Sequence, residues 1–312
     1  MKLNKEFYQL PFKFDVEKLQ SEIAQFDESE WHPHHEHFRG NLSLPLISVN
    51  GGLNNDFKGQ MKPTKHLAKT PYIRQIMTNF NEVFGRSRLM RLEPDCEVPL
   101  HSDINYHWYK RVRIHIPITT SPDVLFYCGD ECINMAQGDT WIFDTWRHHK
   151  VVNNSNASRV HLVLDTTGSS RFWDLLSEQN QQKEPLFIPF IENAPTKIIT
   201  ENFNVQTVMS PGELDYLISE LINEIQANTS NAPTVSKEFE RILQTFSQEW
   251  RQLYSVFGTK QDGWPHYHHL RDATVKGSLK VARELKLSNG DPAIQMLIHC
   301  IVDPALNPEV AS

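Results

Sequence analysis

A change of texture along this 312-residue chain constrains its fold more than any other feature. Between about residues 86 and 167, short runs of β-branched and aromatic residues alternate with turns such as Glu93-Pro-Asp95 and Gln137-Gly-Asp139. Strands separated by turns at intervals of about 8–12 residues are typical of a sandwich or barrel rather than a parallel sheet. The predicted strands are Ser87–Leu92, Val98–Asp103, Arg111–Thr119, Val124–Cys128, Thr140–Asp144, Lys150–Val152 and Arg159–Asp165.

Helical patterns flank this β-rich stretch on both sides. Asp15 is a good N-cap, and Pro71 suits the first position of a helix. Further along, apolar residues recur at helical spacing. We therefore expect a β domain over residues 1–205 and a helical domain over residues 206–312. The predicted helices are Phe14–Phe26, Pro71–Phe80, two after Pro211 with apolar stripes from Leu214 to Ile225 and from Phe239 to Leu253, and Pro292–Val302.

Composition excludes several classes of protein. The net charge is -7 and the Lys and Arg residues are scattered, which argues against nucleic-acid binding. No apolar run approaches the ~18 residues of a membrane span, and the first 15 residues lack the apolar segment of a signal peptide. Four cysteines do not make a disulfide framework in a chain of this length. We expect a cytoplasmic protein without a membrane or nucleic-acid partner, and a homo-oligomer stays open.

The first group of chemical interest is His101-Ser-Asp103. Residues i and i+2 of a strand point to the same face, so this imidazole and this carboxylate can converge on one metal ion. They make two thirds of the 2-His-1-carboxylate triad of non-haem Fe(II) oxygenases. Because such triplets also occur by chance, the pair alone does not establish a metal site.

A downstream hairpin supplies the missing parts. Its first strand begins at a histidine, His148 or His149, and its second strand begins at Arg159. By alternation, Arg159 and His161 share one face of the second strand. A guanidinium is the planar, bidentate partner that the distal carboxylate of 2-oxoglutarate needs. The keto acid end of 2-oxoglutarate would then chelate Fe(II), with one position left for O2.

The motif order resembles a known family. His101-x-Asp103, then Phe143-Asp-x-x-x-x-His149-x-Val-x-Asn153, then Arg159, is similar to the aspartyl/asparaginyl β-hydroxylase-like oxygenases over about residues 40–168. The upstream segments 45–52 and 63–72 look like the bacterial free-proline hydroxylases of that family. The resemblance implies a mainly β, double-stranded β-helix core of the jelly-roll or cupin type, with N-terminal helices and a helical C-terminal region. It also implies that His101, Asp103 and His149, not His148, bind the metal.

The same resemblance implies further pocket residues. On the alternating strand 111–117, Arg113 and His115 would line the pocket near 2-oxoglutarate and the substrate carboxylate. The alternative is an ordinary edge strand with a solvated polar face. Arg88 and Arg91, on the strand before His101, are additional candidates for contacts with the substrate carboxylate.

Three other groups of metal-binding residue types are interpreted as structural. The histidines of Trp31–His37 and of Trp264–His269 match no zinc spacing, so both segments are expected to be surface loops. Cys128 and Cys132 lack a second cysteine pair and are expected to be small buried hydrophobes.

The favoured function is an Fe(II)- and 2-oxoglutarate-dependent dioxygenase that hydroxylates an amino-acid C–H bond. Its substrate would be a free amino acid such as proline, or an Asp, Asn or Pro residue in a polypeptide, and 2-oxoglutarate would be decarboxylated to succinate and CO2. The main alternative is a catalytically silent β-helix that binds a ligand and interacts through its helical tail. A zinc hydrolase would leave Arg159 unexplained.

Overall fold

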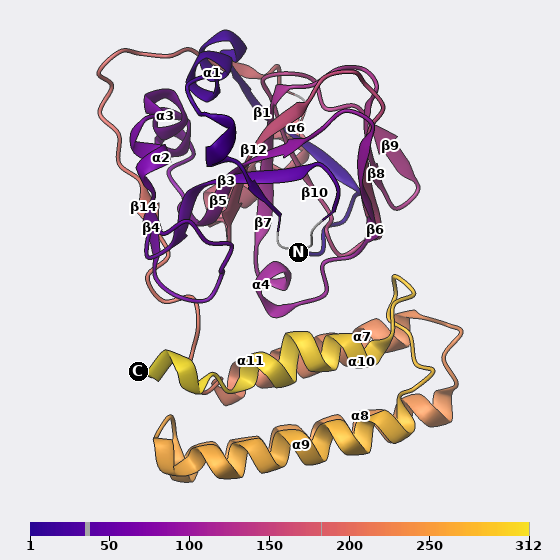
Figure 1. Cartoon of the computed structure of the whole chain (residues 1–312). Coiled ribbons are helices and arrows are strands. Elements are labelled where there is room, and N and C mark those ends of the chain that lie inside the picture. Colours follow the sequence, from indigo (N-terminus) through magenta and orange to yellow (C-terminus); the bar gives the residue numbers. More distant parts are fainter. Residues whose placement is uncertain (35–37, 182, 312) are drawn as a thin grey trace. The chain divides into compact units, whose positions relative to one another are not determined.

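The computed structural model describes residues 1–34, 38–181 and 183–311, and the chain divides into two compact units (Figure 1). We call the first the β unit; it contains Met1–Asp103 and Lys110–Asn204. We call the second the helical unit; it contains Ile104–Tyr109 and Val205–Ser312. The division after Asn204 coincides with the change of sequence texture, whereas the six-residue excursion at Ile104–Tyr109 has no counterpart in the sequence pattern.

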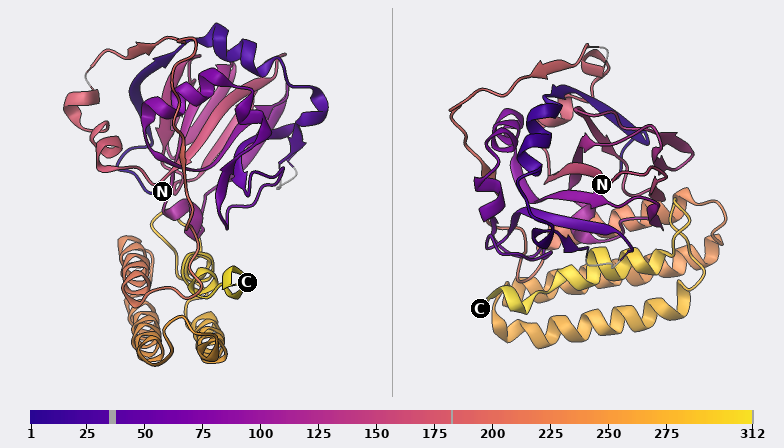
Figure 2. Two further views of the ribbon diagram at one scale, coloured as in Figure 1. Left: turned by 90° about the vertical axis from the view of Figure 1, so that its left-hand side faces the viewer. Right: turned by 45° about the horizontal axis from the view of Figure 1, so that its top comes forward.

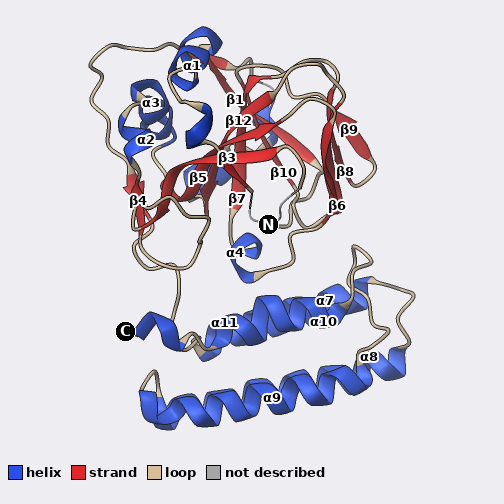
Figure 3. Cartoon of the chain, in the orientation of Figure 1, coloured by secondary structure: helices blue, strands red, loops and turns tan. Residues whose placement is uncertain are grey.

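Two sheets make up the β unit, and they hold the strands shown in Figure 3. The larger sheet contains β1 (Phe7–Phe14), β2 (His32–Pro33), β3 (Asn41–Val49), β4 (Met61–Pro63), β5 (Val83–Leu92), β7 (Val112–Thr119), β10 (Asp139–Phe143), β12 (Arg159–Thr166), β13 (Leu186–Ile188) and β14 (Ile199–Thr200). The smaller sheet contains β6 (Cys96–His101), β8 (Val124–Cys128), β9 (Glu131–Ile133) and β11 (His149–Asn153).

Successive strands pass from one sheet to the other. The chain runs through β5 in the larger sheet, β6 in the smaller, β7 in the larger and β8 in the smaller. It then follows β9 in the smaller sheet and repeats the alternation through β10, β11 and β12. The main path of the larger sheet is β13-β1-β10-β7-β12-β5-β3-β2, and that of the smaller sheet is β6-β11-β8-β9. This winding confirms the predicted double-stranded β-helix.

β12 shows how the sequence builds this core. All eight of its residues are buried, because the strand lies between β5 and β7 and is covered on both faces. Val160, Leu162 and Leu164 belong to the main apolar cluster. The alternate residues Arg159 and Val163 line a cavity on the opposite face of the sheet. The period-2 alternation therefore separates structural from chemical residues.

Helices α1 (Val16–Ile23) and α3 (Pro71–Phe80) contribute to the same apolar cluster, as predicted for the N-terminal helices. Asp15 caps α1 by accepting a hydrogen bond from the Lys18 amide, and Pro71 opens α3. The carboxylate of Glu22 accepts hydrogen bonds from the amides of Tyr72 and Ile73, which satisfies the start of α3. The remaining short helices of the β unit are α2 (Lys65–Ala68), α5 (Ser170–Asp174) and α6 (Glu178–Gln181).

The β core extends beyond residues 86–167, where we had placed it. β1 pairs with β10, and β3 pairs with β5, so two strands from the N-terminal 50 residues complete the larger sheet. Phe7–Phe14 is an alternating segment and Asn41–Val49 a largely buried one, but neither lies between regular turn signals. These two segments form strands because they pair with β10 and β5, which lie far from them in the sequence.

The helical unit is built around three long helices, α7 (Pro211–Ala227), α8 (Pro233–Phe257) and α9 (Trp264–Val281). α8 and α9 lie side by side (Figure 2), with the Trp250 and Tyr267 rings 4.5 Å apart. The prediction of a surface loop at Trp264–His269 is wrong: Pro265 occupies an initial position of α9, where a proline is tolerated. The C-terminal segment forms α10 (Ala293–Met296), a π-helical turn η3 (Leu297–Val302) and α11 (Asp303–Ala305).

The excursion at Ile104–Tyr109 contains the short helix α4 (Tyr106–Tyr109). The Tyr106 hydroxyl donates a hydrogen bond to Glu213 of α7, and the Tyr109 hydroxyl donates one to Glu220 of the same helix. These bonds explain why the segment belongs to the helical unit. Among the helices in the described ranges, none has the length and apolarity required to cross a membrane.

Candidate metal centre and adjoining pocket

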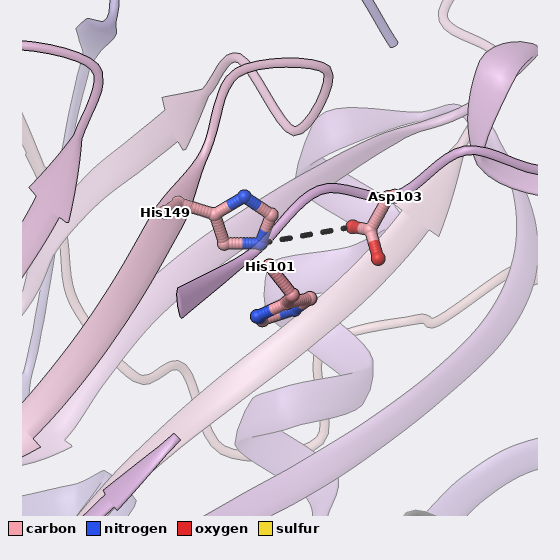
Figure 4. Close-up of side chains that lie close together, drawn as sticks. All are labelled: His101, Asp103 and His149. Carbon is pink, nitrogen blue, oxygen red and sulfur yellow. Dashed lines mark ion pairs between the residues drawn. The ribbon is translucent and has the colours of Figure 1, made fainter. Parts of the chain in front are cut away.

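Two neighbouring strands of the smaller sheet bring the predicted metal ligands together. β6 and β11 pair antiparallel with His101 directly opposite His149, and Asp103 follows two residues after His101 (Figure 4). One ligand atom from each residue lies within 4.8 Å of the others. The Nε2 atom of His149 and the Oδ2 atom of Asp103 are 3.9 Å apart. Within the part of the chain that the structure describes, this is the group of three side chains suited to a metal ion.

Backbone carbonyls orient both imidazoles. The Nδ1 atom of His101 lies 2.7 Å from the Pro99 carbonyl, and that of His149 lies 2.9 Å from the Arg147 carbonyl. Because a carbonyl oxygen only accepts, each Nδ1 carries the proton and each Nε2 keeps its lone pair for a metal. The Asp103 amide donates to the Thr145 carbonyl at 2.9 Å, which fixes the backbone beside the third ligand.

The electrostatics suit a divalent cation. Burial lowers the pKa of His149 to about 4, so its imidazole is neutral at neutral pH. Burial acts to raise the pKa of Asp103, but Arg113 and the two histidines outweigh it and the pKa is lowered. The Arg113 guanidinium lies 2.9 Å from the Asp103 carboxylate. Two imidazoles and a carboxylate are a donor set that fits Fe(II) and leaves coordination positions open.

A cavity of about 80 Å³ adjoins these ligands. Arg159 lines it and is only 5% exposed, with its guanidinium carbon 5.0 Å from the centre of the Phe126 ring. Burial lowers the pKa of Arg159 to about 9, which still leaves it charged at neutral pH. Its Nε atom has no hydrogen-bond partner among the described residues. A guanidinium that is buried, charged and without a partner at Nε is suited to bind an anionic ligand.

His115 lies in the same cavity with neither ring nitrogen hydrogen-bonded within the described ranges. Burial, followed by the charges of Arg159 and Arg113, holds the pKa of His115 well below its ordinary value. The ring is therefore a neutral donor and acceptor beside Arg159. The remaining lining residues are His34, Asn41, Arg88, Met90, Val98, His101, Arg113, Phe126, Phe143, His149, Val151 and Val163.

The two remaining candidate arginines, Arg88 and Arg91, have different surroundings in the structure. Arg88 lines the cavity, but Arg91 does not. Arg91 instead forms ion pairs with Glu28 and Glu93 and packs over the Trp31 ring. Two residues that are three positions apart on a strand face opposite sides, so Arg91 cannot share the pocket face of β5 with Arg88. The expectation that Arg91 contacts the substrate carboxylate is therefore wrong, because Arg91 does not line the cavity.

Two polar lining residues, His34 and Asn41, were missed by sequence reasoning. His34 is buried and lines the cavity, although we had assigned its histidine-rich segment to a surface loop. The His34 amide donates to the Asn41 carbonyl, and Asn41 also lines the cavity. A pairing between β2 and β3 at the sheet edge places His34 there, and a two-residue strand leaves no periodic signal. The rest of that expected loop, residues 35–37, lies outside the described residues.

Sequence comparison links the β unit to a hydroxylase family. Residues 18–168 match the sequence model of the family described as Aspartyl/Asparaginyl beta-hydroxylase. L-proline cis-3-hydroxylase 1 from a Streptomyces species is 25% identical over 173 residues, covering 52% of this chain and 56% of that protein. The chain therefore matches little more than half the length of that relative.

Solved structures with partial similarity include an oxidoreductase of the 2OG-Fe(II) oxygenase family from Burkholderia pseudomallei. It has a TM-score of 0.38 and 11% identity, covering 49% of this chain and 78% of that one. A prolyl-4-hydroxylase from Pseudomonas putida has a TM-score of 0.36 and 14% identity, covering 52% of this chain and 92% of that one.

Proposed function

We propose that this chain is an Fe(II)- and 2-oxoglutarate-dependent dioxygenase that hydroxylates an amino-acid C–H bond, because residues 18–168 match the sequence model of the aspartyl/asparaginyl β-hydroxylase family. The amino acid would be free or part of a polypeptide. One observation carries the proposal: both histidines of the two-histidine, one-carboxylate group line the same cavity as the buried Arg159.

Each side chain has a defined task in this proposal. His101, Asp103 and His149 hold Fe(II), which with 2-oxoglutarate and O2 supplies the oxidising chemistry. Arg159 pairs with the distal carboxylate of 2-oxoglutarate through two parallel N–H···O bonds. His115 donates a hydrogen bond from its neutral ring to the same ligand. Phe126 and Phe143 exclude water from the cavity, which strengthens these polar interactions.

The geometry disfavours the alternative of a silent ligand-binding β-helix. A sensor of a simple carboxylate needs Arg159 but has no use for two histidines and an aspartate whose ligand atoms lie within 4.8 Å of one another. The zinc-hydrolase alternative needs the three ligands but leaves the buried charge of Arg159 without a task. Only the oxygenase uses both features of the cavity.

The charge of the cavity bears on the substrate. Its described lining includes Arg88, Arg113 and Arg159 but no aspartate or glutamate. Arg113 is paired with Asp103, and 2-oxoglutarate would be bound by Arg159. Arg88 is the third arginine of the lining, and we assign it to the carboxylate of a substrate. A free amino acid would bring an ammonium group for which the lining offers no carboxylate. We therefore expect acids whose nitrogen is in an amide to be better substrates than the free zwitterions.

The test is succinate formation from 2-oxoglutarate, with Fe(II) and O2, across a substrate panel. The panel compares free L-proline and L-aspartate with their N-acetyl forms and with short peptides that contain them. His101→Ala and His149→Ala should abolish substrate-dependent turnover, whereas the adjacent His148→Ala should retain it. Succinate formation that persists without iron, or activity lost in His148→Ala and kept in His149→Ala, would contradict the proposal.

A further inference from the structure

The described lining of the cavity contains one carboxamide, that of Asn41. Asn41 is the first residue of β3 and is only 5% exposed. Its backbone is paired, because its carbonyl accepts a hydrogen bond from the His34 amide and its backbone amide donates one to the Phe38 carbonyl. Its side chain makes no hydrogen bond within the described ranges. A buried carboxamide without a partner destabilises a folded chain, so this one, in the wall of a cavity, points to a ligand.

The register of the larger sheet directs the Asn41 side chain inward. Asn41 lies directly opposite Leu92 of β5, and Leu92 lies directly opposite Arg159 of β12. Residues directly opposite each other in a sheet share one face, so these three side chains form a row on the same face. Leu92 belongs to the apolar cluster that contains Phe126 and Val151, both of which line the cavity. Asn41 therefore faces the cavity from a regular strand position.

The chemistry of a carboxamide separates the two forms in which the nitrogen of an amino acid occurs. The Nδ2 group of Asn41 can donate a hydrogen bond to the carbonyl of an acylated nitrogen, and a free ammonium group has no such carbonyl. The Oδ1 atom can accept a hydrogen bond from an ammonium group but leaves its charge uncompensated. The described lining holds three arginines and no aspartate or glutamate, so nothing else in it compensates that charge.

We propose that Asn41 is a specificity-determining residue that binds the amide on the substrate nitrogen and so selects acylated amino acids over free ones. This inference rests on the proposed function and names the group that distinguishes the two forms. Arg88, which we assign to the substrate carboxylate, lines the same cavity. The amide is that of an N-acyl amino acid or of a peptide bond, because both offer Asn41 the same carbonyl.

The experiment compares two substitutions of nearly equal size in the full chain. Asn41→Leu removes both polar atoms, whereas Asn41→Asp replaces the donor with a second acceptor and adds a negative charge. Succinate formation is measured with L-proline, L-aspartate and their N-acetyl forms. Binding of the same acids is measured without O2 on protein loaded with Mn(II) and 2-oxoglutarate, which gives a readout that does not depend on turnover.

The two variants should change specificity in different ways. Asn41→Leu should lower kcat/KM for the N-acetyl acids roughly 2- to 10-fold, the effect of one neutral hydrogen bond, and leave the free acids unchanged. Asn41→Asp should also favour the free acids, because a carboxylate pairs with their ammonium group, so the ratio of N-acetyl to free form should fall roughly 20-fold or more. Asn154→Asp is the matched control: it adds the same charge at an exposed position directly after β11, outside the cavity, and should keep the wild-type ratio.

Stability separates this role from a structural one. Because the Asn41 carboxamide has no partner among the described residues, Asn41→Leu should not lower the free energy of unfolding in a denaturant titration. A lower free energy of unfolding, a ratio of N-acetyl to free form that is unchanged in both variants, or a wild type that prefers the free acids would overturn the assignment of Asn41 and leave the oxygenase intact. Wild-type protein that forms no succinate with any of the substrates would instead overturn the proposed function, and this inference with it.

Discussion

The sharpest prediction concerns Arg159→Lys. Arg159 opens β12, is nearly inaccessible to solvent and lines the cavity against Phe126. In the proposed function its two terminal N–H groups bind both oxygens of one carboxylate of 2-oxoglutarate. Lysine keeps the positive charge but replaces a planar fork with a single point of contact. The substitution therefore isolates the geometry of the interaction from its charge.

The expected magnitude follows from the loss of one charge-assisted hydrogen bond. Such a bond contributes about 1.5–3 kcal/mol, and a buried site offers no water to replace it. At about 1.4 kcal/mol per factor of ten, the Michaelis constant for 2-oxoglutarate should rise roughly 10- to 150-fold. The contact lies at the end of 2-oxoglutarate remote from the reacting keto acid, so the turnover number should fall much less.

The assay is succinate formation at varied 2-oxoglutarate and saturating substrate, together with anaerobic 2-oxoglutarate binding to the Mn(II)-loaded protein. Arg91→Lys is the matched control, because Arg91 lies on the neighbouring strand β5 but outside the cavity. It should leave both measurements unchanged. A change of less than about threefold in Arg159→Lys would refute the reasoning, and Arg113 would become the first alternative partner of the carboxylate.

Three further predictions test the surroundings of the site. Arg113→Ala should weaken Mn(II) binding and reduce hydroxylated product per 2-oxoglutarate consumed, because Asp103 loses its 2.9 Å partner; an unchanged product-to-succinate ratio and affinity would remove Arg113 from the site. Mn(II) at 100 times its dissociation constant should raise the free energy of unfolding by about 2.7 kcal/mol in the wild type and not in His101→Ala, measured by denaturant titration. His161 is fully buried, and burial followed by Arg159 and His115 lowers its pKa well below the ordinary value. The unfolded chain therefore binds a proton below about pH 6.5 that the folded chain does not, and stability falls on acidification. His161→Phe should reduce the slope of stability between pH 7 and 5 by up to about 1.4 kcal/mol per pH unit, and an unchanged slope would show that this histidine does not titrate differently on unfolding.

The sequence by itself determined those features that depend on neighbours along the chain. The cap at Asp15 and the proline at Pro71 placed two helices, because both act on backbone groups within a few residues. Period-2 alternation separated Arg159 from Val160 on β12, because successive side chains of a strand point to opposite faces. The same rule predicted that His101 and Asp103 would converge, and they do, although β6 ends at His101 and Asp103 lies two residues beyond the strand.

Only the tertiary structure decided which face of each element became the site. Alternation puts Arg88 and Arg91 on opposite faces of β5, but the pairing of that strand between β12 and β3 determines which face meets the cavity. His34 reached the lining through a two-residue strand at the sheet edge, and the six residues after Asp103 joined the helical unit through Glu213 and Glu220. These placements depend on contacts between residues about 10 to more than 100 positions apart. No local pattern encodes such contacts, because their free energy is gained only when the whole chain has packed.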